Sequence, residues 1–171
     1  MGCASTSART LPGVRAVQFD MADSDFPASL VDLPEPELPS PAWGRVAVST
    51  GGICGSDLHL FAHNTGPSPT LMTMGSFPFV LGHEIAGRVI EAGPECLHPV
   101  GTRVCIDPCL PCSVRGIDPP CPNCRRGWTS SCLNLDSRVV ASGRSLGFTQ
   151  GLGGGWGQQT LAQSTDPLAT G

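Results

Sequence analysis

The sequence of 171 residues contains no lysine and no tyrosine, and only 14% of its residues are charged. All ten of its strongly basic residues are arginines, they form no basic block, and the formal net charge is −4. Such a chain lacks the positive charge that drives binding to nucleic acids or anionic membrane surfaces. It also lacks any apolar run near the length of about 18 residues that a membrane-spanning helix needs. We therefore expect neither a nucleic acid nor a membrane as a partner.

Long helical patterns are also scarce, whereas turn formers are abundant, with 22 glycines and 17 prolines. No helical pattern of 10–15 residues stands between strands, so no βαβ unit is predicted. Short strands with a cysteine-rich segment predict a mainly β protein built as a small β-barrel. We expect a disordered leader over 1–13 and one domain over 14–171, with a metal-binding lobe at about 108–133. Expected strands are 14–19, 30–33, 45–50, 87–93, 102–107, 138–141 and 160–162, with a short helix over 56–63 capped by Ser56 and a loop over 64–80.

Nine cysteines in a chain of this size need an explanation. Disulfides would suit an oxidising compartment, and metal sites a reducing one. Residues 1–14 contain no continuous apolar stretch of the kind found in secretory signal peptides. Because nine is odd, the cysteines cannot all pair within one chain. The pattern therefore favours metal sites in a cytoplasmic protein.

The most specific cysteine spacing lies in the predicted lobe. Two residues separate Cys121 from Cys124, and Cys132 follows after seven more. A structural zinc takes four ligands in a tetrahedron, and thiolates suit this borderline-soft, redox-inert ion. Cys112 is the natural fourth ligand, with Cys109 in reserve. An iron–sulfur cluster or a pair of disulfides would use the same residues, but a structural zinc is the favoured interpretation.

A second set of candidate ligands is divided between two segments. Cys54 follows a predicted strand and a glycine turn, and His83 lies 29 residues later, beside Glu84. One thiolate and one imidazole on separate loops can bind zinc and leave a position open, as catalytic zinc sites do. Glu84 is close enough in sequence to bind or displace the metal.

Three polar residues follow Cys54 in the same segment. The Ser56 hydroxyl is suited to contact a ligand on the metal and pass a proton onward. His59 is the nearby group that titrates near neutrality and could receive that proton. Asp57 is suited to accept the free N–H of His83 and fix its tautomer. Each residue alone has a simpler structural interpretation, and the joint pattern favours a functional one.

At these residues the sequence resembles the zinc-dependent alcohol dehydrogenases of the medium-chain dehydrogenase/reductase family. The resemblance covers roughly 14–165. It is carried by the segments 52–59, 82–87 with Gly93, 100–104, the cysteine lobe to Cys132, and the glycine-rich stretch 153–157.

The resemblance implies a GroES-like β-barrel catalytic domain in an enzyme that oxidises an alcohol or polyol to a carbonyl with NAD or NADP. It implies two zinc ions, one catalytic and one structural. The catalytic zinc would take Cys54 and His83, with Glu84 as ligand or close neighbour. Ser56 and His59 would form the proton relay, with Asp57 supporting the site. The structural zinc would take Cys112, Cys121, Cys124 and Cys132.

The sequence departs from the family pattern in two important places. If the family's spacing is counted back from Cys121, the first ligand position of the lobe falls on Asp118. If it is counted forward from residues 107–108, the same position falls on Cys112. These residues contain no G-x-G-x-x-G motif, since the run 151–157 lacks the required spacing and context, so we expect the family's Rossmann domain to be missing from them. We therefore expect this chain to be inactive alone and any homo-oligomer to form through the missing part. The alternatives are a non-catalytic zinc-binding fragment or partner-stabilising module, and a zinc-ribbon interaction module.

Overall fold

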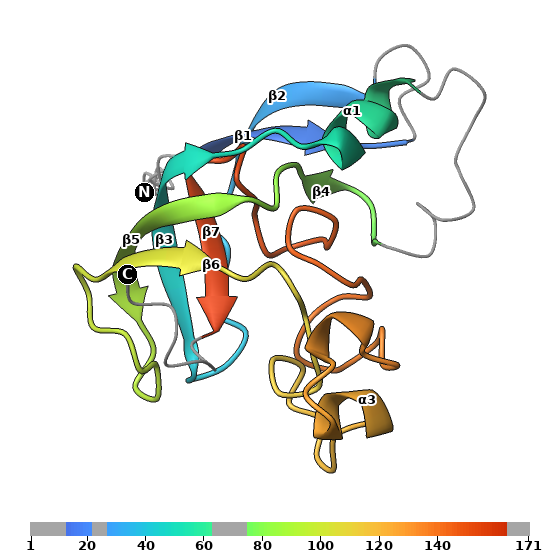
Figure 1. The fold of residues 1–171 in the computed structure, drawn as a ribbon. Coiled ribbons are helices and arrows are strands. Elements are labelled where there is room, and N and C mark those ends of the chain that lie inside the picture. Colours follow the sequence, from blue (N-terminus) through green and yellow to red (C-terminus); the bar gives the residue numbers. More distant parts are fainter. Residues whose placement is uncertain (1–12, 22–26, 63–74, 164–171) are drawn as a thin grey trace, which may run out of the picture.

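Two antiparallel sheets form the framework of the chain (Figure 1). The computed structural model describes residues 13–21, 27–62 and 75–163. The strand order is β2-β1-β4 in one sheet and β6-β5-β3-β7 in the other. The strands are β1 (Val14–Phe19), β2 (Ala28–Leu33), β3 (Trp43–Gly51), β4 (Phe79–Val80), β5 (Ile85–Ala92), β6 (Arg103–Ile106) and β7 (Gln159–Gln163). The helices are α1 (Gly55–Ala62), α3 (Pro122–Arg125) and the 3₁₀ turn η1 (Thr129–Ser131). The prediction of a mainly β protein is confirmed.

The larger sheet is held by the alternating apolar side chains of its central strands. Val46 of β3, Val89 of β5 and Val104 of β6 form one buried cluster. Trp43 and Leu161, from β3 and β7, belong to a second cluster that extends into the segment after β6. Period-2 alternation places such residues on one face of a strand, which is why these strands were predictable.

The smaller sheet packs an aromatic cluster that fixes the position of α1. Phe19 and Phe79 stack with ring centroids 5.6 Å apart, and Phe79 contacts Phe148 at 5.5 Å. Leu60, a buried apolar residue of α1, belongs to the same cluster. The helix is therefore anchored to this sheet through its apolar side.

The glycine-rich stretch 153–157 joins the two sheets. Gly155 N–H donates to the Gly82 carbonyl at 2.8 Å, and Val17 N–H donates to the Trp156 carbonyl at 3.0 Å. A side chain at Gly154 would collide with the carbonyl oxygens of residues 80–82. The glycines thus permit the close backbone approach expected for a barrel turn.

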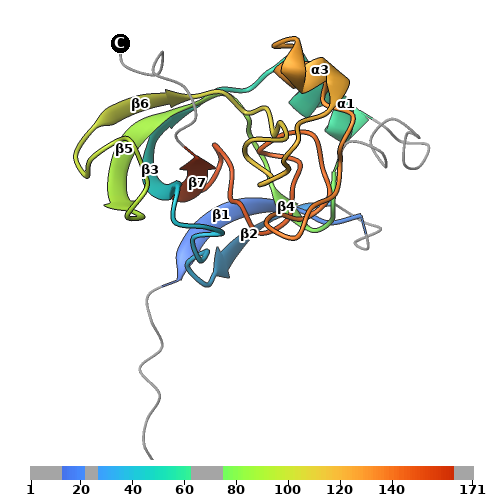
Figure 2. The ribbon, with the colours of Figure 1, turned by 90° about the horizontal axis from the view of Figure 1, so that it is seen from below.

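The cysteine-rich segment lies outside both sheets, where α3 and η1 interrupt an otherwise irregular chain (Figures 1 and 2). Its buried cluster consists of the thiols of Cys112, Cys121 and Cys132, with Ile117 and Cys124 packed against them. An apolar core this small cannot offset the conformational entropy of ordering so long a segment, so another interaction must hold it.

Three expectations about local structure are wrong. The predicted loop over 64–80 ends in β4, and its residues 64–74 lie outside the described part. Residues 138–141 form no strand, because the Ser137 hydroxyl accepts the N–H groups of Val139 and Val140 in place of a neighbouring strand. Ser56 is not the cap of α1, since the helix begins at Gly55. The leader expected over 1–13 falls almost wholly on residues 1–12, which lie outside the described part.

Across the described ranges, no helix has both the length and the apolar character needed to cross a membrane.

Candidate functional site

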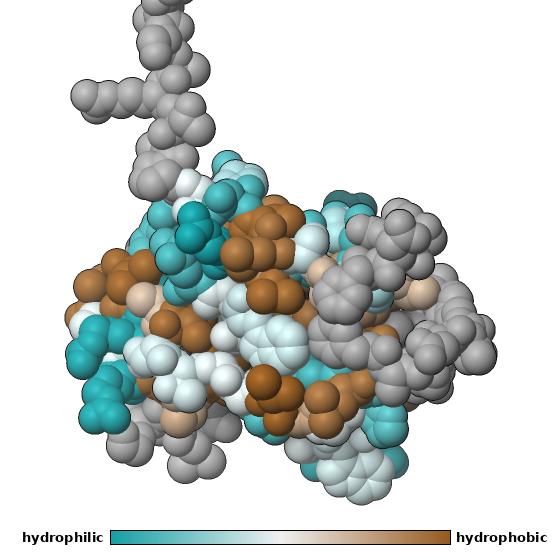
Figure 3. Space-filling model, turned by 90° about the horizontal axis from the view of Figure 1, so that it is seen from above, coloured by the Kyte–Doolittle hydropathy of each residue, from teal (hydrophilic) through white to brown (hydrophobic). Residues whose placement is uncertain are grey.

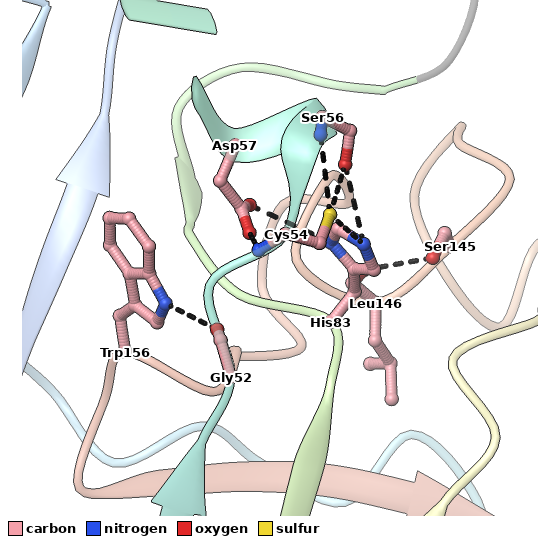
Figure 4. A network of polar contacts seen from close by, with 8 residues as sticks. All are labelled: Gly52, Cys54, Ser56, Asp57, His83, Ser145, Leu146 and Trp156. Atoms are coloured by element: carbon pink, nitrogen blue, oxygen red, sulfur yellow. Dashed lines mark hydrogen bonds and ion pairs between the residues drawn. The ribbon is translucent and has the colours of Figure 1, made fainter. Parts of the chain in front are cut away.

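Two loops bring Cys54 and His83 together at the start of α1 (Figure 4). Cys54 follows the end of β3, and His83 lies between β4 and β5. The Cys54 Sγ and His83 Nε2 atoms are 3.1 Å apart. Ser56 Oγ lies 2.7 Å from the sulfur and 3.4 Å from Nε2. One sulfur, one nitrogen and one oxygen atom therefore converge on the same point.

Helix capping explains why the thiol of Cys54 is placed there. Leu58 N–H donates to the Cys54 carbonyl, which makes Cys54 the residue that caps α1. Its sulfur accepts the Ser56 N–H at 3.3 Å, and the Asp57 carboxylate accepts the Cys54 N–H at 2.9 Å. This reciprocal arrangement is a capping box with a cysteine as cap and an aspartate three residues later.

Asp57 connects the cap to the histidine. Its side chain is fully buried, and while Oδ2 accepts the Cys54 N–H, Oδ1 lies 3.7 Å from His83 Nδ1. Both Oδ1 and Nδ1 are buried, and neither accepts or donates a hydrogen bond within the described part. Asp57 therefore faces one ring nitrogen of His83 while the other ring nitrogen faces the Cys54 sulfur. This is the arrangement predicted for a carboxylate that orients a ligand histidine.

His59 and Glu84 lie at the edge of this cluster. Both are exposed, and neither belongs to the group of ligand atoms found around Cys54, Asp57 and His83. The Glu84 side chain covers Gly52, where an added Cβ would collide with its carboxylate. The structure thus brings Cys54, Ser56, Asp57 and His83 together and leaves Glu84 and His59 beside them.

Trp156 connects both ligand-bearing loops and was not predicted to do so. Its indole Nε1 donates to the Gly52 carbonyl at 2.9 Å, two residues before Cys54 (Figure 4). The same ring lies against Gly82, one residue before His83, where φ is +88° and a side chain would meet the indole. The position of Trp156 within the glycine-rich stretch was the one sequence feature that pointed to it, but the sequence could not show that its indole contacts Gly52 and Gly82.

Apolar surface is exposed around α1. Figure 3 views the molecule from the side on which α1 and β2 lie in Figure 1, and apolar residues lie there in patches among polar ones. Ile53 and Leu58 are 66% and 61% exposed and belong to the same loop and helix as Cys54. The cluster is thus flanked by side chains able to contact an apolar group.

The lobe gathers the four cysteines Cys112, Cys121, Cys124 and Cys132, whose sulfur atoms all lie within 4.8 Å of one another. The Cys112 and Cys132 sulfurs are 3.6 Å apart, and those of Cys121 and Cys132 are 4.0 Å apart. All the described cysteines are free thiols. Cys109 and Asp118, the alternatives for the fourth position, lie outside this group. Between Cys112 and Cys121 the chain forms a turn in which the Ile117 N–H donates to the Cys112 carbonyl at 2.9 Å.

Hydrogen bonds and burial set the ionisation of these thiols. Cys121 caps α3, and backbone N–H groups of Leu133 and Cys124 hold its pKa below the ordinary value. Burial raises the pKa of Cys124 and of Cys132. Outside the cluster, burial and then the neighbouring Asp107 raise the pKa of Cys109 to about 11. Cys121 thus ionises more readily than Cys124 and Cys132.

Both clusters fit zinc by the chemistry of their donors. Around a tetrahedral zinc, sulfurs at about 2.3 Å from the metal are roughly 3.8 Å from one another, and the Cys112–Cys132 and Cys121–Cys132 sulfur distances bracket that value. A sulfur and a nitrogen ligand would be roughly 3.5 Å apart, compared with 3.1 Å between Cys54 Sγ and His83 Nε2. The lobe offers a closed set of four thiols, and the first cluster an open set of mixed donors.

Comparison with known proteins gives consistent matches. The model of the alcohol dehydrogenase GroES-like domain family matches residues 40–169. The D-altritol 5-dehydrogenase of Agrobacterium fabrum is 34% identical over 115 residues, which cover 67% of this chain and 30% of that protein. The galactitol 1-phosphate 5-dehydrogenase of Escherichia coli is 30% identical over 132 residues, or 75% of this chain and 33% of that protein.

Solved structures agree with these matches. A zinc-binding dehydrogenase from Sinorhizobium meliloti bound to NADP aligns with a TM-score of 0.64 at 28% identity, over 90% of this chain and 37% of that one. The galactitol-1-phosphate dehydrogenase of E. coli aligns with a TM-score of 0.61 at 25% identity, over 88% and 36%. The chain spans about a third of the length of the curated relatives it matches. On the family model and the shared fold, this chain belongs to the alcohol dehydrogenase GroES-like domain family.

Proposed function

We propose that this chain is the catalytic domain of a zinc-dependent oxidoreductase that oxidises an alcohol or polyol to a carbonyl with NAD or NADP. The observation that carries the proposal is the convergence of Cys54 Sγ, Ser56 Oγ and His83 Nε2 at one point. The names of the relatives support alcohols and polyols as the substrate class.

In this proposal Cys54 and His83 hold the catalytic zinc, which when bound supplies Lewis-acid polarisation of the substrate hydroxyl. Asp57 keeps His83 in the tautomer whose Nε2 is free to bind a metal. Glu84 is positioned as an additional or alternating ligand. Ile53 and Leu58 contribute apolar surface beside the reacting group.

Ser56 and His59 carry the proton away. The Ser56 hydroxyl lies within the cluster and would accept the proton of the substrate hydroxyl while it passes its own proton toward His59. His59 follows three residues later, on the same side of α1, and is exposed to water. The proton then passes from the buried side of the site to an imidazole that exchanges it with solvent.

Two further parts complete the proposal. A structural zinc held by the four lobe cysteines would stabilise the irregular segment 108–133. NAD or NADP would accept the hydride and would be bound outside residues 14–163, so the chain alone would have no turnover.

Native mass spectrometry of the purified chain tests the zinc assignments. We expect about two zinc ions per chain, and one after the double substitution Cys54→Ala with His83→Ala. Cys105→Ala is the matched control, because Cys105 is an exposed thiol outside both clusters. One zinc in the unmodified chain would favour the alternative of a non-catalytic zinc-binding module.

Cobalt substitution tests whether the open site binds an alcohol. The visible bands of Co²⁺ report changes in its ligands, so a polyol that enters the Cys54–His83 site should shift them. The shift should vanish in the Cys54→Ala chain, while the bands of the four-thiolate site stay. Absence of any shift at saturating polyol would contradict an alcohol-binding role. Zinc-dependent reduction of NAD⁺ or NADP⁺ by the unmodified chain would disprove the proposal that the isolated chain is inactive.

A further inference from the structure

An arginine is buried beside the cysteine lobe. Arg115 is 1% exposed and lies three residues after Cys112. Its guanidinium donates to three backbone carbonyls: Leu110 at 3.0 Å, Ala141 at 3.5 Å, and Gly143. The side chain therefore ties the start of the lobe to the segment 141–143 that follows it.

The charge of this arginine has no direct counter-ion. Within the described part of the chain, Arg115 forms no ion pair with a carboxylate. The negative groups that act on it are Cys132, Asp136 and Cys112, and they oppose the lowering of its pKa by burial. A buried cation that is hydrogen-bonded but unpaired is unfavourable. A further negative charge close to Arg115, beyond that of Asp136, would therefore stabilise it.

A loaded zinc centre would supply that compensation. Four thiolates and one divalent ion carry a net charge of −2. The sulfur of Cys112 already accepts the side-chain N–H of Asn134 at 3.2 Å and the backbone N–H of Cys121 at 3.3 Å, as a thiolate ligand would. The backbone N–H of Arg115 donates to the Cys112 carbonyl at 3.1 Å, so the buried positive charge and the expected negative centre belong to the same lobe.

We propose that Arg115 is the charge-compensating positioning residue of the four-thiolate zinc centre, and that zinc binding and the docking of residues 141–143 stabilise each other through it. This inference rests on the structural zinc of the proposed function. Arg115 acts on the centre through its charge and on the loop through its hydrogen bonds. Zinc retention in the lobe is therefore coupled to the ordering of residues 141–143, although this loop contributes no ligand to the zinc.

Competition for zinc between the chain and a chromophoric chelator tests the proposal. The measurement is made in a Cys54→Ala chain, so that the zinc affinity measured is that of the lobe. Arg115→Gln removes the charge and keeps an amide donor, and Arg115→Lys keeps the charge without the planar fork. We expect Arg115→Gln to weaken zinc binding about 10- to 100-fold, as loss of groups around a metal's ligands does. Arg115→Lys should retain most of the affinity.

The matched control is Arg126→Gln, two residues after Cys124. Arg126 is exposed and lies over the Trp128 ring at 5.4 Å, so loss of its charge should leave zinc affinity unchanged. Equal weakening by the glutamine and lysine variants of Arg115 would overturn the charge role. If the Cys54→Ala chain binds no zinc at all, the structural zinc site of the proposed function has failed, which is a different result.

A second measurement needs no variant at Arg115. Hydrogen exchange of the unmodified chain is compared with zinc bound and after chelation. We expect faster exchange in residues 139–146 as well as in 112–132 when zinc is removed. Protection of 139–146 that survives chelation would show that the docking of this loop is independent of zinc, and would overturn the coupling.

Discussion

Replacing Asp57 by asparagine should switch the tautomer of His83. The new side chain is nearly the same shape, and its carbonyl oxygen must take over the Cys54 N–H, which Oδ2 accepts at 2.9 Å. Its amide N–H₂ would then face His83 Nδ1, where Asp57 Oδ1 lies at 3.7 Å. An N–H donor there favours the tautomer with hydrogen on Nε2, which cannot bind a metal.

The size of the effect follows from the hydrogen bond that a metal-bound His83 would form with Asp57 and that the asparagine could not accept. Metal binding through Nε2 leaves hydrogen on Nδ1, and that hydrogen would point at the fully buried Asp57 carboxylate. A hydrogen bond to a charged group contributes about 1.5–3 kcal/mol. At about 1.4 kcal/mol for each factor of ten, Asp57→Asn should weaken zinc binding at the Cys54–His83 site about 10- to 100-fold.

Chelator competition followed by native mass spectrometry measures this loss, and the four-thiolate site in the same molecule is the internal reference. Asp107→Asn is the matched control, because Asp107 also accepts a nearby backbone N–H, that of Cys109 at 2.9 Å, but belongs to neither cluster. Unchanged zinc affinity in Asp57→Asn, or an equal loss in Asp107→Asn, would refute the tautomer argument.

Three further results are expected. Trp156→Phe keeps the ring but removes the bond to the Gly52 carbonyl, so the free energy of unfolding in urea should fall by about 1–2 kcal/mol; an unchanged value would show that water replaces the bond. Gly82→Ala should cost about 1–3 kcal/mol in the same assay, because φ is +88° and the indole occupies the space; a smaller loss would mean that the loop relaxes. Cys109, whose pKa is raised from 9.0 to about 11, should react slowly with iodoacetamide at pH 8, and Asp107→Asn should speed the reaction by lowering that pKa, as peptide mass spectrometry would show; equal rates would exclude an effect of Asp107.

Alternation predicted the strands because their side chains are divided between a core and a solvent-facing side. β1 was placed at its observed bounds, and β3 extends the predicted strand by two residues at the start and one at the end. β4 has two residues, too few to show a period. The apolar run 139–141 is buried through Val140, but its backbone N–H groups are accepted by Ser137 rather than by a sheet. Hydropathy cannot distinguish these two ways of burying a valine.

The sequence predicted which residue types form the candidate site, but not which hydrogen bonds hold them in place. Spacing identified Cys54, His83 and the lobe cysteines as candidate ligands. It left Cys112 and Asp118 as alternatives for the fourth lobe ligand, because that choice depends on how the chain folds between Cys112 and Cys121. Arg115 and Trp156 could not be identified, since their partners are backbone carbonyls far along the chain. Carbonyls are present at every residue and leave no signal in a sequence. The roles of the site residues stay predictions until the zinc measurements are made.

Cys54 and Cys121 share one feature: each thiol is both the cap of a helix and a candidate metal ligand. Serine and aspartate are good caps too, and serine is a poor ligand for zinc. A single exchange of either cysteine for serine would thus preserve the local folding signal while abolishing the metal site. At Cys54, whose helix is anchored by the apolar cluster around Leu60, loss of the metal site can therefore leave the backbone unchanged. At Cys121 the same exchange would keep the cap but also remove the zinc expected to hold the irregular segment 108–133.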